Sequence, residues 1–138
     1  MTDRELIRLA FAARENAYAP YSGFWVGAAL LAKNGSVFTG CNVENAAYSA
    51  TCCAERTALF KAVSEGVREF EKIAIVGAFQ GKVNKEITSP CGVCRQALFE
   101  FGGPKLEVIM AKGEDDFVKM TLGELLPLGF GPANLDKS

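Results

Sequence analysis

Histidine is missing from this sequence of 138 residues. Imidazole is the side chain that most often acts as a base or binds a metal ion near neutral pH, and it activates the nucleophile in Ser-His and Cys-His pairs. No such pair can form here. Any chemistry must therefore depend on Cys, Glu, Asp, Lys, Tyr or a bound metal ion.

An excess of one charge is lacking as well. The 15 Lys and Arg residues balance 16 Asp and Glu residues, so the formal net charge is −1. Proteins that bind long nucleic acids carry a basic stripe or patch that attracts the phosphates. We therefore expect no nucleic-acid partner, whereas a small neutral ligand is compatible with this composition.

Long apolar runs are absent too. The longest run, 24–32, is about half of the roughly 20 residues that a membrane helix needs. The first five residues, 1–5, are too charged for the apolar centre of a signal peptide. We expect a cytoplasmic protein with no membrane partner.

The composition favours one globular domain. Apolar residues make up 49% of the chain and charged residues 22%, as in ordinary globular proteins. A chain of this length can bury a substantial core, and it contains no linker, internal repeat or low-complexity segment. Residues 1–138 are therefore expected to form a single domain.

Hydrophobic periodicity predicts helices that alternate with strands. Thr2 and Glu5 form a capping box, and Asn34-Gly35 predicts a hairpin turn. We expect helices over 2–17, 53–65 and 91–101 and a short one from Thr121, and strands over 24–32, 36–43, 73–79, 106–111 and 117–120. This order indicates an α/β fold, with helices on the faces of a sheet that opens with an antiparallel hairpin. The segment after Pro132 is expected to be loose.

Four polar residues lie at the starts of two predicted helices. Cys53 and Glu55 begin one helix, and Cys91 and Cys94 begin another. Unpaired N–H groups and partial positive charge at a helix N-terminus favour the thiolate form of cysteine, which binds metal ions. Residues two apart, such as Cys53 and Glu55, point in nearly opposite directions within a helix. They can converge only on an ion just beyond the helix end.

Three thiolates with no histidine predict a zinc ion with one open position. Structural zinc sites use four protein ligands, whereas catalytic sites use three and leave the fourth position for water. Glu55 is suited to accept a proton from that water. Three thiolates outweigh the charge of Zn²⁺, so a cationic donor to a ligand sulfur is expected. Arg56 and Arg95 are the candidates, and we favour Arg56.

The cysteine spacing is compatible with three alternative roles. Cys91 and Cys94 could form a thioredoxin-like redox pair, although the Cys-Ala-Glu motif would then be unexplained. A structural four-cysteine zinc site would need Cys41 or Cys52, whose roles are unassigned. The thiols could also be inert and buried. The combination of Cys-Ala-Glu with Pro-Cys-x-x-Cys matches the zinc-deaminase signature, whose first ligand is His or Cys.

Several longer motifs resemble the small cytidine deaminases. They are APYSGF (19–24), VGAAL (26–30), GCNVENA (40–46), CAERTA (53–58), SPCGVCRQ (89–96) and ELLP (124–127). The resemblance implies a homotetramer of three-layer α/β/α subunits with a mixed sheet and one zinc ion per subunit. It also implies an enzyme of pyrimidine salvage, a hydrolase that converts cytidine and deoxycytidine to uridine and deoxyuridine with release of ammonia.

The resemblance further implies contacts with the nucleoside. Phe24 would pack against the pyrimidine, and Asn42 and Glu44 would hold the ribose 3′-hydroxyl. The backbone around Ala54 is expected to bind the Watson–Crick edge of the base, because a buried neutral base needs hydrogen-bond partners. Each side chain also has a purely structural alternative: strand packing for Phe24, and loop capping for the other two.

Three further positions resemble residues that reach a neighbouring subunit's site. They are Ala46, Tyr48 and Phe130. A loop tyrosine commonly only packs, and Phe130 could be a simple oligomer contact. The residues around Phe130, 128–134, depart from the family pattern, which leaves the pose of its ring open.

The expected mechanism depends on Glu55, which takes a proton from the attacking water, protonates N3 of the pyrimidine and supplies a proton to the departing amino group. Three rival functions are weighed against it. A deaminase of another aminopyrimidine nucleoside, such as blasticidin, would share the metal motif. A polynucleotide editor is disfavoured by the weak charge. A zinc-binding module without activity would not need Glu55.

Overall fold

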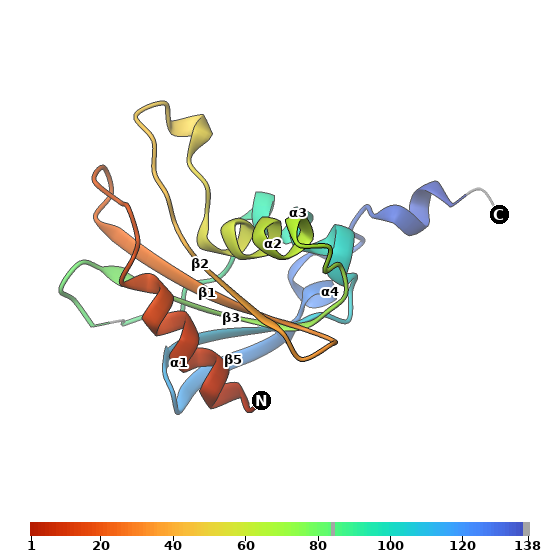
Figure 1. Cartoon of the computed structure of the whole chain (residues 1–138), viewed down its shortest axis with the longest axis horizontal. Helices are drawn as coiled ribbons and strands as arrows, with labels where there is room; N and C mark the ends of the chain where they lie inside the picture. Colours follow the sequence, from red (N-terminus) through yellow and green to blue (C-terminus); the bar gives the residue numbers. More distant parts are fainter. Residues whose placement is uncertain (84, 137–138) are drawn as a thin grey trace.

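The computed structural model describes residues 1–83 and 85–136 as a five-stranded sheet between helices (Figure 1). The strands are ordered β2-β1-β3-β4-β5. They span Phe24–Ala32 (β1), Val37–Cys41 (β2), Phe70–Phe79 (β3), Glu107–Gly113 (β4) and Asp116–Thr121 (β5). The helices span Asp3–Arg14 (α1), Ala54–Ser64 (α2), Gly92–Gly102 (α3) and Leu122–Leu125 (α4), with 3₁₀ turns at Tyr48–Ala50 (η1) and Pro132–Leu135 (η2).

The sheet is mixed, as the sequence predicts. β1 pairs with β2 in an antiparallel hairpin whose turn contains Gly35 at φ 91°, a conformation that favours glycine. β1 is also antiparallel to β3, and β4 is antiparallel to β5. β3 and β4 are parallel, and α3 supplies the crossover that a parallel pair needs.

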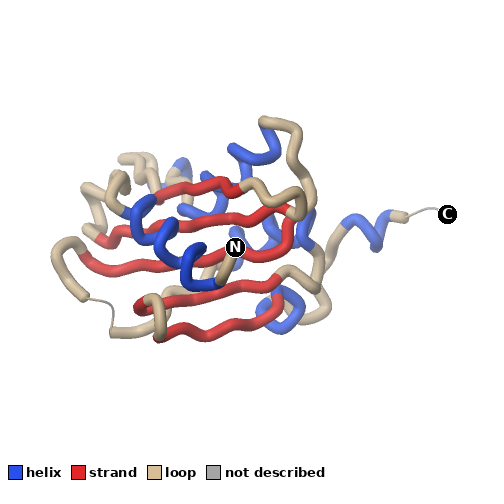
Figure 2. The backbone as a smooth tube through the Cα atoms, turned by 60° about the horizontal axis from the view of Figure 1, so that its bottom comes forward, coloured by secondary structure: helices blue, strands red, loops and turns tan. Residues whose placement is uncertain are grey.

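Two apolar cores lie on opposite faces of the sheet. Alternate residues of β3 face opposite sides, so that Ile75 packs in one core and Val76 in the other. α1 covers one face of the sheet, as Figure 2 shows. Leu6 and neighbouring apolar residues of this helix pack in the core on that face. α2 and α3 cover the other face, where Leu59 and Leu98 are fully buried. The three-layer α/β/α prediction is therefore confirmed.

Two glycines let helices approach the sheet closely. A Cβ atom on Gly27 would lie 2.0 Å from the carbonyl oxygen of Ala10 in α1. A Cβ atom on Gly40 would lie 2.6 Å from the carbonyl oxygen of Ala54 in α2. Both contacts are with backbone, so the helices could not stay where they are if either glycine carried a side chain.

The structure departs from the sequence prediction in a few places. α1 ends at Arg14 rather than at residue 17, and β3 begins at Phe70, three residues early. The segment after Pro132, expected to be loose, forms one 3₁₀ turn (η2), in which Asn134 accepts a hydrogen bond from the backbone N–H of Gly131 (2.9 Å); residues 132–136 are exposed, and 137–138 lie outside the described residues. None of the helices in the described part of the chain has the length and apolarity needed to cross a membrane.

Candidate metal and catalytic site

The N-termini of α2 and α3 meet at one place. Cys53 is the N-cap residue of α2, and Cys91 is the N-cap residue of α3. Both have extended backbone conformations just before the helix, and Cys94 and Glu55 lie within the first turns. The prediction that these residues begin two helices is confirmed. The positive ends of both helix dipoles consequently face the same three thiols.

The three sulfur atoms lie at chelating distances. The Sγ atoms of Cys53 and Cys91 are 3.6 Å apart, and all three sulfurs, with that of Cys94, lie within 4.8 Å of one another. Two sulfurs bound to one tetrahedral zinc ion at about 2.3 Å would be about 3.8 Å apart. The site therefore fits Zn²⁺ with little rearrangement, and it leaves one coordination position for a non-protein ligand.

The remaining cysteines lie outside this group in the described part of the chain. The sulfur of Cys52 contacts the hydroxyl of Thr57 at 3.6 Å and the carbonyl oxygen of Cys53 at 3.7 Å, so it faces the start of α2. Cys41 is half-buried at the end of β2. Neither residue completes a four-cysteine set.

Hydrogen bonds among the thiols set their protonation. The pKa of Cys53 is lowered to about 5, chiefly by a hydrogen bond from the Cys94 thiol and further by the Arg56 guanidinium. The pKa of Cys94 is raised, chiefly because its proton is held in the same bond to Cys53. Both shifts come from the same hydrogen bond, which favours the thiolate at Cys53 over that at Cys94. A bound metal ion takes the place of the thiol proton.

The two candidate arginines have different partners. Nη2 of Arg56 lies 3.6 Å from the Sγ of Cys53 and donates to the carbonyl oxygen of Thr51 at 3.3 Å. Its pKa is raised, chiefly by the contact with Cys53. Nε of Arg56 is buried without a hydrogen-bond partner among the described residues. Arg95 instead donates to the carbonyl oxygens of Pro90 and Leu125. The contact that we favoured for Arg56 is therefore the one that forms.

Glu55 is buried beside the thiols. Its side chain is 3% exposed, and its pKa is raised to about 7, chiefly by burial and next by the negative charge on Cys53. A carboxyl group with a pKa near the working pH both accepts and returns protons readily. The environment therefore suits Glu55 for proton transfer.

A cavity of about 310 Å³ opens next to Glu55 and the thiols. This volume is at the lower end of the range of small-molecule sites. Its walls include the predicted residues Phe24, Asn42, Glu44 and Ala54. Sequence reasoning missed five further lining residues, Ser22, Val26, Thr51, Thr88 and Ser89. Ser22, Val26 and Ser89 each lie in one of the motifs that resemble the family, whereas Thr51 and Thr88 lie outside those motifs.

The polar side chains at the cavity wall also hold the backbone. Asn42 accepts a hydrogen bond from the N–H of Val26 (2.9 Å) and donates to the carbonyl oxygen of Phe24 (2.8 Å). Glu44 accepts hydrogen bonds from the N–H groups of Tyr21 and Ser22 and from the Ser22 hydroxyl. The Ser22 hydroxyl is the main reason that the pKa of Glu44 is lowered. The loop-capping alternative thus describes part of what these side chains do.

Three predicted residues do not line this cavity. Ala46 and Tyr48 lie in an exposed loop, where Tyr48 is 74% exposed and packs edge-on against Tyr21 with ring centroids 5.8 Å apart. Phe130 is 58% exposed, and its carbonyl oxygen accepts a hydrogen bond from Gln96 (2.8 Å). Figure 1 shows this loop and the C-terminal segment standing out from the body of the protein.

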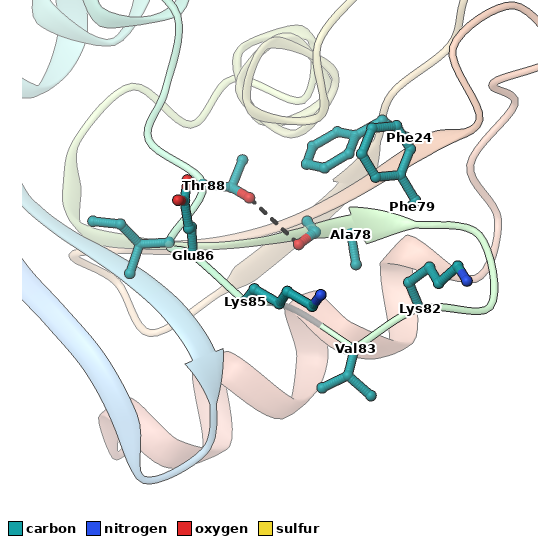
Figure 3. A pocket seen from close by; sticks show the side chains of 10 residues that line it. Phe24, Ala78, Phe79, Lys82, Val83, Lys85, Glu86 and Thr88 are labelled. Carbon is teal, nitrogen blue, oxygen red and sulfur yellow. Dashed lines mark hydrogen bonds between the residues drawn. The ribbon is translucent and has the colours of Figure 1, made fainter.

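A larger cavity of about 530 Å³ lies beside the first one (Figure 3). Phe24 and Thr88 line both cavities, so they form the wall between them. The larger cavity is bordered by Phe79 and by Lys82 and Glu86 of the loop after β3. It contains neither the thiols nor a buried carboxylate, so the chemistry that the sequence predicts belongs to the smaller cavity.

Several known proteins are similar to this chain in both sequence and fold. A family model described as the cytidine and deoxycytidylate deaminase zinc-binding region matches residues 1–110. The chain is 48% identical over 135 residues to a cytidine deaminase of Sporosarcina psychrophila, covering 98% of this chain and 96% of that protein. It is 50% identical over 129 residues to the cytidine deaminase of Halalkalibacterium halodurans, covering 93% and 94%. A crystal structure of cytidine deaminase from Burkholderia pseudomallei matches with a TM-score of 0.87 and 51% identity, covering 94% of this chain and all (100%) of that one. This chain therefore belongs to the cytidine and deoxycytidylate deaminase family.

Proposed function

We propose that this protein hydrolyses the 4-amino group of cytidine and deoxycytidine, releasing ammonia and forming uridine and deoxyuridine for pyrimidine salvage. One observation carries the proposal: three thiols at chelating distances and a buried carboxyl group meet at one end of a cavity of nucleoside size. Cys53, Cys91 and Cys94 would hold the zinc ion. When bound, the ion makes a water molecule acidic enough to supply a hydroxide nucleophile at neutral pH.

Glu55 moves the protons in this proposal. It accepts one from the attacking water and delivers it to N3 of the pyrimidine. It then takes the proton of the new hydroxyl group at C4 and passes it to the departing amino group, so that ammonia leaves and the C4 carbonyl forms. The other carboxylate at the cavity, Glu44, has a lowered pKa and stays ionised near neutral pH. The two carboxyl groups therefore have different duties, and only Glu55 has a pKa suited to carrying a proton.

The same cavity would orient the nucleoside. Phe24 would pack against the pyrimidine, and the backbone at Ala54 would meet its Watson–Crick edge. Asn42 and Glu44 would bind the ribose 3′-hydroxyl. Their placement in the cavity wall supports these roles. The hydrogen bonds that they make to the backbone leave them rigid, and a rigid group loses little conformational freedom when it binds a ligand.

The test is ammonia release from cytidine, deoxycytidine and blasticidin S by the zinc-loaded protein and by Glu55→Gln. We expect turnover of both natural nucleosides and a loss of about 10²- to 10⁴-fold in the variant. Zinc content should stay near one ion per chain, since glutamine is nearly isosteric with glutamate. Release from blasticidin S alone would favour the antibiotic-deaminase alternative. Full activity of the variant would exclude the proposed proton transfers.

We also propose a cytoplasmic homotetramer in which Ala46, Tyr48 and Phe130 complete a neighbouring subunit's site. Their exposure and their position outside their own cavity support this arrangement. Co-expression of two weakly active variants, Phe130→Ala and Glu55→Gln, provides a test. If Phe130 acts between subunits, mixed oligomers contain sites with both intact residues and recover activity. Sedimentation as a monomer, or no recovery in mixed oligomers, would contradict this arrangement.

A further inference from the structure

Arg95 follows the predicted ligand Cys94 directly, yet its guanidinium binds backbone rather than sulfur. Nε donates to the carbonyl oxygen of Pro90 at 2.8 Å, and Nη1 donates to the carbonyl oxygen of Leu125 at 2.7 Å. Pro90 immediately precedes Cys91, and Leu125 is the last residue of α4. One half-buried side chain therefore joins the turn before a metal ligand to an element 30 residues away in sequence.

The turn before Cys91 needs such a contact. Cys91 is exposed, whereas Cys53 is half-buried and Cys94 is fully buried, so packing constrains Cys91 least among the three ligands. Pro90 has no N–H group, and its carbonyl oxygen is the only polar backbone atom through which it can be held. Arg95 donates a hydrogen bond to that oxygen. A bond from a charged donor is stronger than one from a neutral donor, which makes it an effective anchor.

The shape of the guanidinium matters as well as its charge. Its planar fork donates in two fixed directions, toward Pro90 and toward Leu125, whereas a lysine ammonium is a point charge on a flexible stem. The next residue, Gln96, donates to the carbonyl oxygen of Phe130 at 2.8 Å. Two consecutive side chains of α3 thus tie the C-terminal segment to the helix that carries Cys94, and only Arg95 also reaches the Cys91 turn.

We propose that Arg95 is a positioning residue that sets where Cys91 presents its sulfur. By holding the Pro90 carbonyl, it keeps the Cys91 sulfur 3.6 Å from that of Cys53. The inference rests on the proposed zinc site. It gives Arg95 a function distinct from that of Arg56, because Arg56 contacts the sulfur of Cys53 itself.

The experiment measures metal binding by reduced protein from which metal has been removed. Zinc affinity is determined by competition with a chromophoric chelator, and the thiolate charge-transfer and d–d bands are recorded with cobalt(II). We expect Arg95→Gln to bind zinc about 10- to 100-fold more weakly, the usual effect of losing a group that orients a ligand. Its cobalt bands should shift, and kcat should fall even at saturating zinc. Arg95→Lys should show a smaller change in the same direction.

Gln96→Ala is the matched control, because Gln96 contacts the same C-terminal segment without reaching the Cys91 turn. It should bind zinc as the unchanged chain does. A normal zinc affinity and cobalt spectrum for Arg95→Gln, with only a lower unfolding free energy, would reduce Arg95 to a structural residue and overturn the proposal. An equal loss of zinc affinity in Gln96→Ala would do the same. If Arg95→Gln is insoluble, Arg95→Lys decides by the same criteria.

The zinc-affinity and cobalt measurements use no nucleoside, so they decide the role of Arg95 without the kinetic data. A wild-type protein that binds zinc but deaminates neither cytidine nor deoxycytidine would contradict the proposed function and leave the Arg95 comparison intact. Conversely, if the wild-type enzyme is active and Arg95→Gln has a normal zinc affinity and cobalt spectrum, only the positioning role is contradicted.

Discussion

Replacing Gly40 by alanine should impair catalysis although Gly40 lies in β2, outside the cavity. A Cβ atom there would lie 2.6 Å from both the carbonyl oxygen of Ala54 and the backbone nitrogen of Ala58, and 2.9 Å from the Cβ of Thr57. All three atoms belong to the first two turns of α2. Since backbone cannot rotate aside as a flexible side chain does, α2 must move away from the sheet by several tenths of an ångström.

This movement would separate the two halves of the site. α2 carries Glu55 and is preceded by Cys53, whereas Cys91 precedes α3 and Cys94 lies in its first turn. Misplacing catalytic groups by about 1 Å can cost roughly 100-fold in rate, so we expect kcat to fall by about 10- to 100-fold. Overpacking should also lower the unfolding free energy by about 1–3 kcal/mol.

Gly27→Ala is the matched control on the opposite face. Its Cβ atom would lie 2.0 Å from the carbonyl oxygen of Ala10 in α1, a closer clash than that at Gly40. The variant should lose at least as much stability while its zinc content and kcat stay near the wild-type values. Urea unfolding, zinc analysis and steady-state kinetics on the folded proteins test the pair. Wild-type kcat in Gly40→Ala, or an equal loss in both variants, would refute the reasoning.

Two further predictions concern Glu55 and Gly77. Burial raises the pKa of Glu55 from 4.5 to about 7, so between these values the folded metal-free protein binds more protons than the unfolded chain and becomes less stable as the pH rises. The unfolding free energy of the wild-type protein, minus that of Glu55→Gln, should fall by about 3 kcal/mol between about pH 4.5 and about pH 8. If this difference does not change with pH, Glu55 is not buried in its neutral form. At Gly77, a Cβ atom would lie 2.6 Å from the Thr88 hydroxyl and 3.0 Å from the Phe24 ring, so Gly77→Ala should raise KM about tenfold by displacing the ring, with zinc content unchanged. Gly113→Ala is the control, because open space surrounds the new methyl group. An unchanged KM in Gly77→Ala would contradict the proposed contact between Phe24 and the substrate.

Much of the fold was predictable because its signals are local. The apolar run at 24–32 coincides with β1, and the Asn34-Gly35 turn sets the hairpin. Element ends were less certain, since they depend on tertiary contacts. β3 begins early because Phe70 pairs with Ala32 across a shift in register, which no local pattern indicates.

The side-chain partners at the site were only partly predictable. Spacing placed Cys53 and Cys91 at helix starts, and both are N-cap residues. Spacing could not tell Arg56 from Arg95, because each follows a motif residue directly. The different roles of the two arginines depend on Leu125. Its carbonyl oxygen comes within reach of Arg95 only after the C-terminal segment packs against α3.

The sequence by itself determined the donor set. Without histidine, a metal site in this chain must rely on thiolates and carboxylates, and the motif spacing restricts it to two helix starts. Only the tertiary structure decided that Cys53 and Cys91, 38 positions apart, lie 3.6 Å from each other. It also decided that Glu55 is buried and has a pKa near 7. The physical reason is that spacing fixes directions within one helix, whereas the distance between two helices depends on how each packs against the sheet, as Gly40 allows α2 to do.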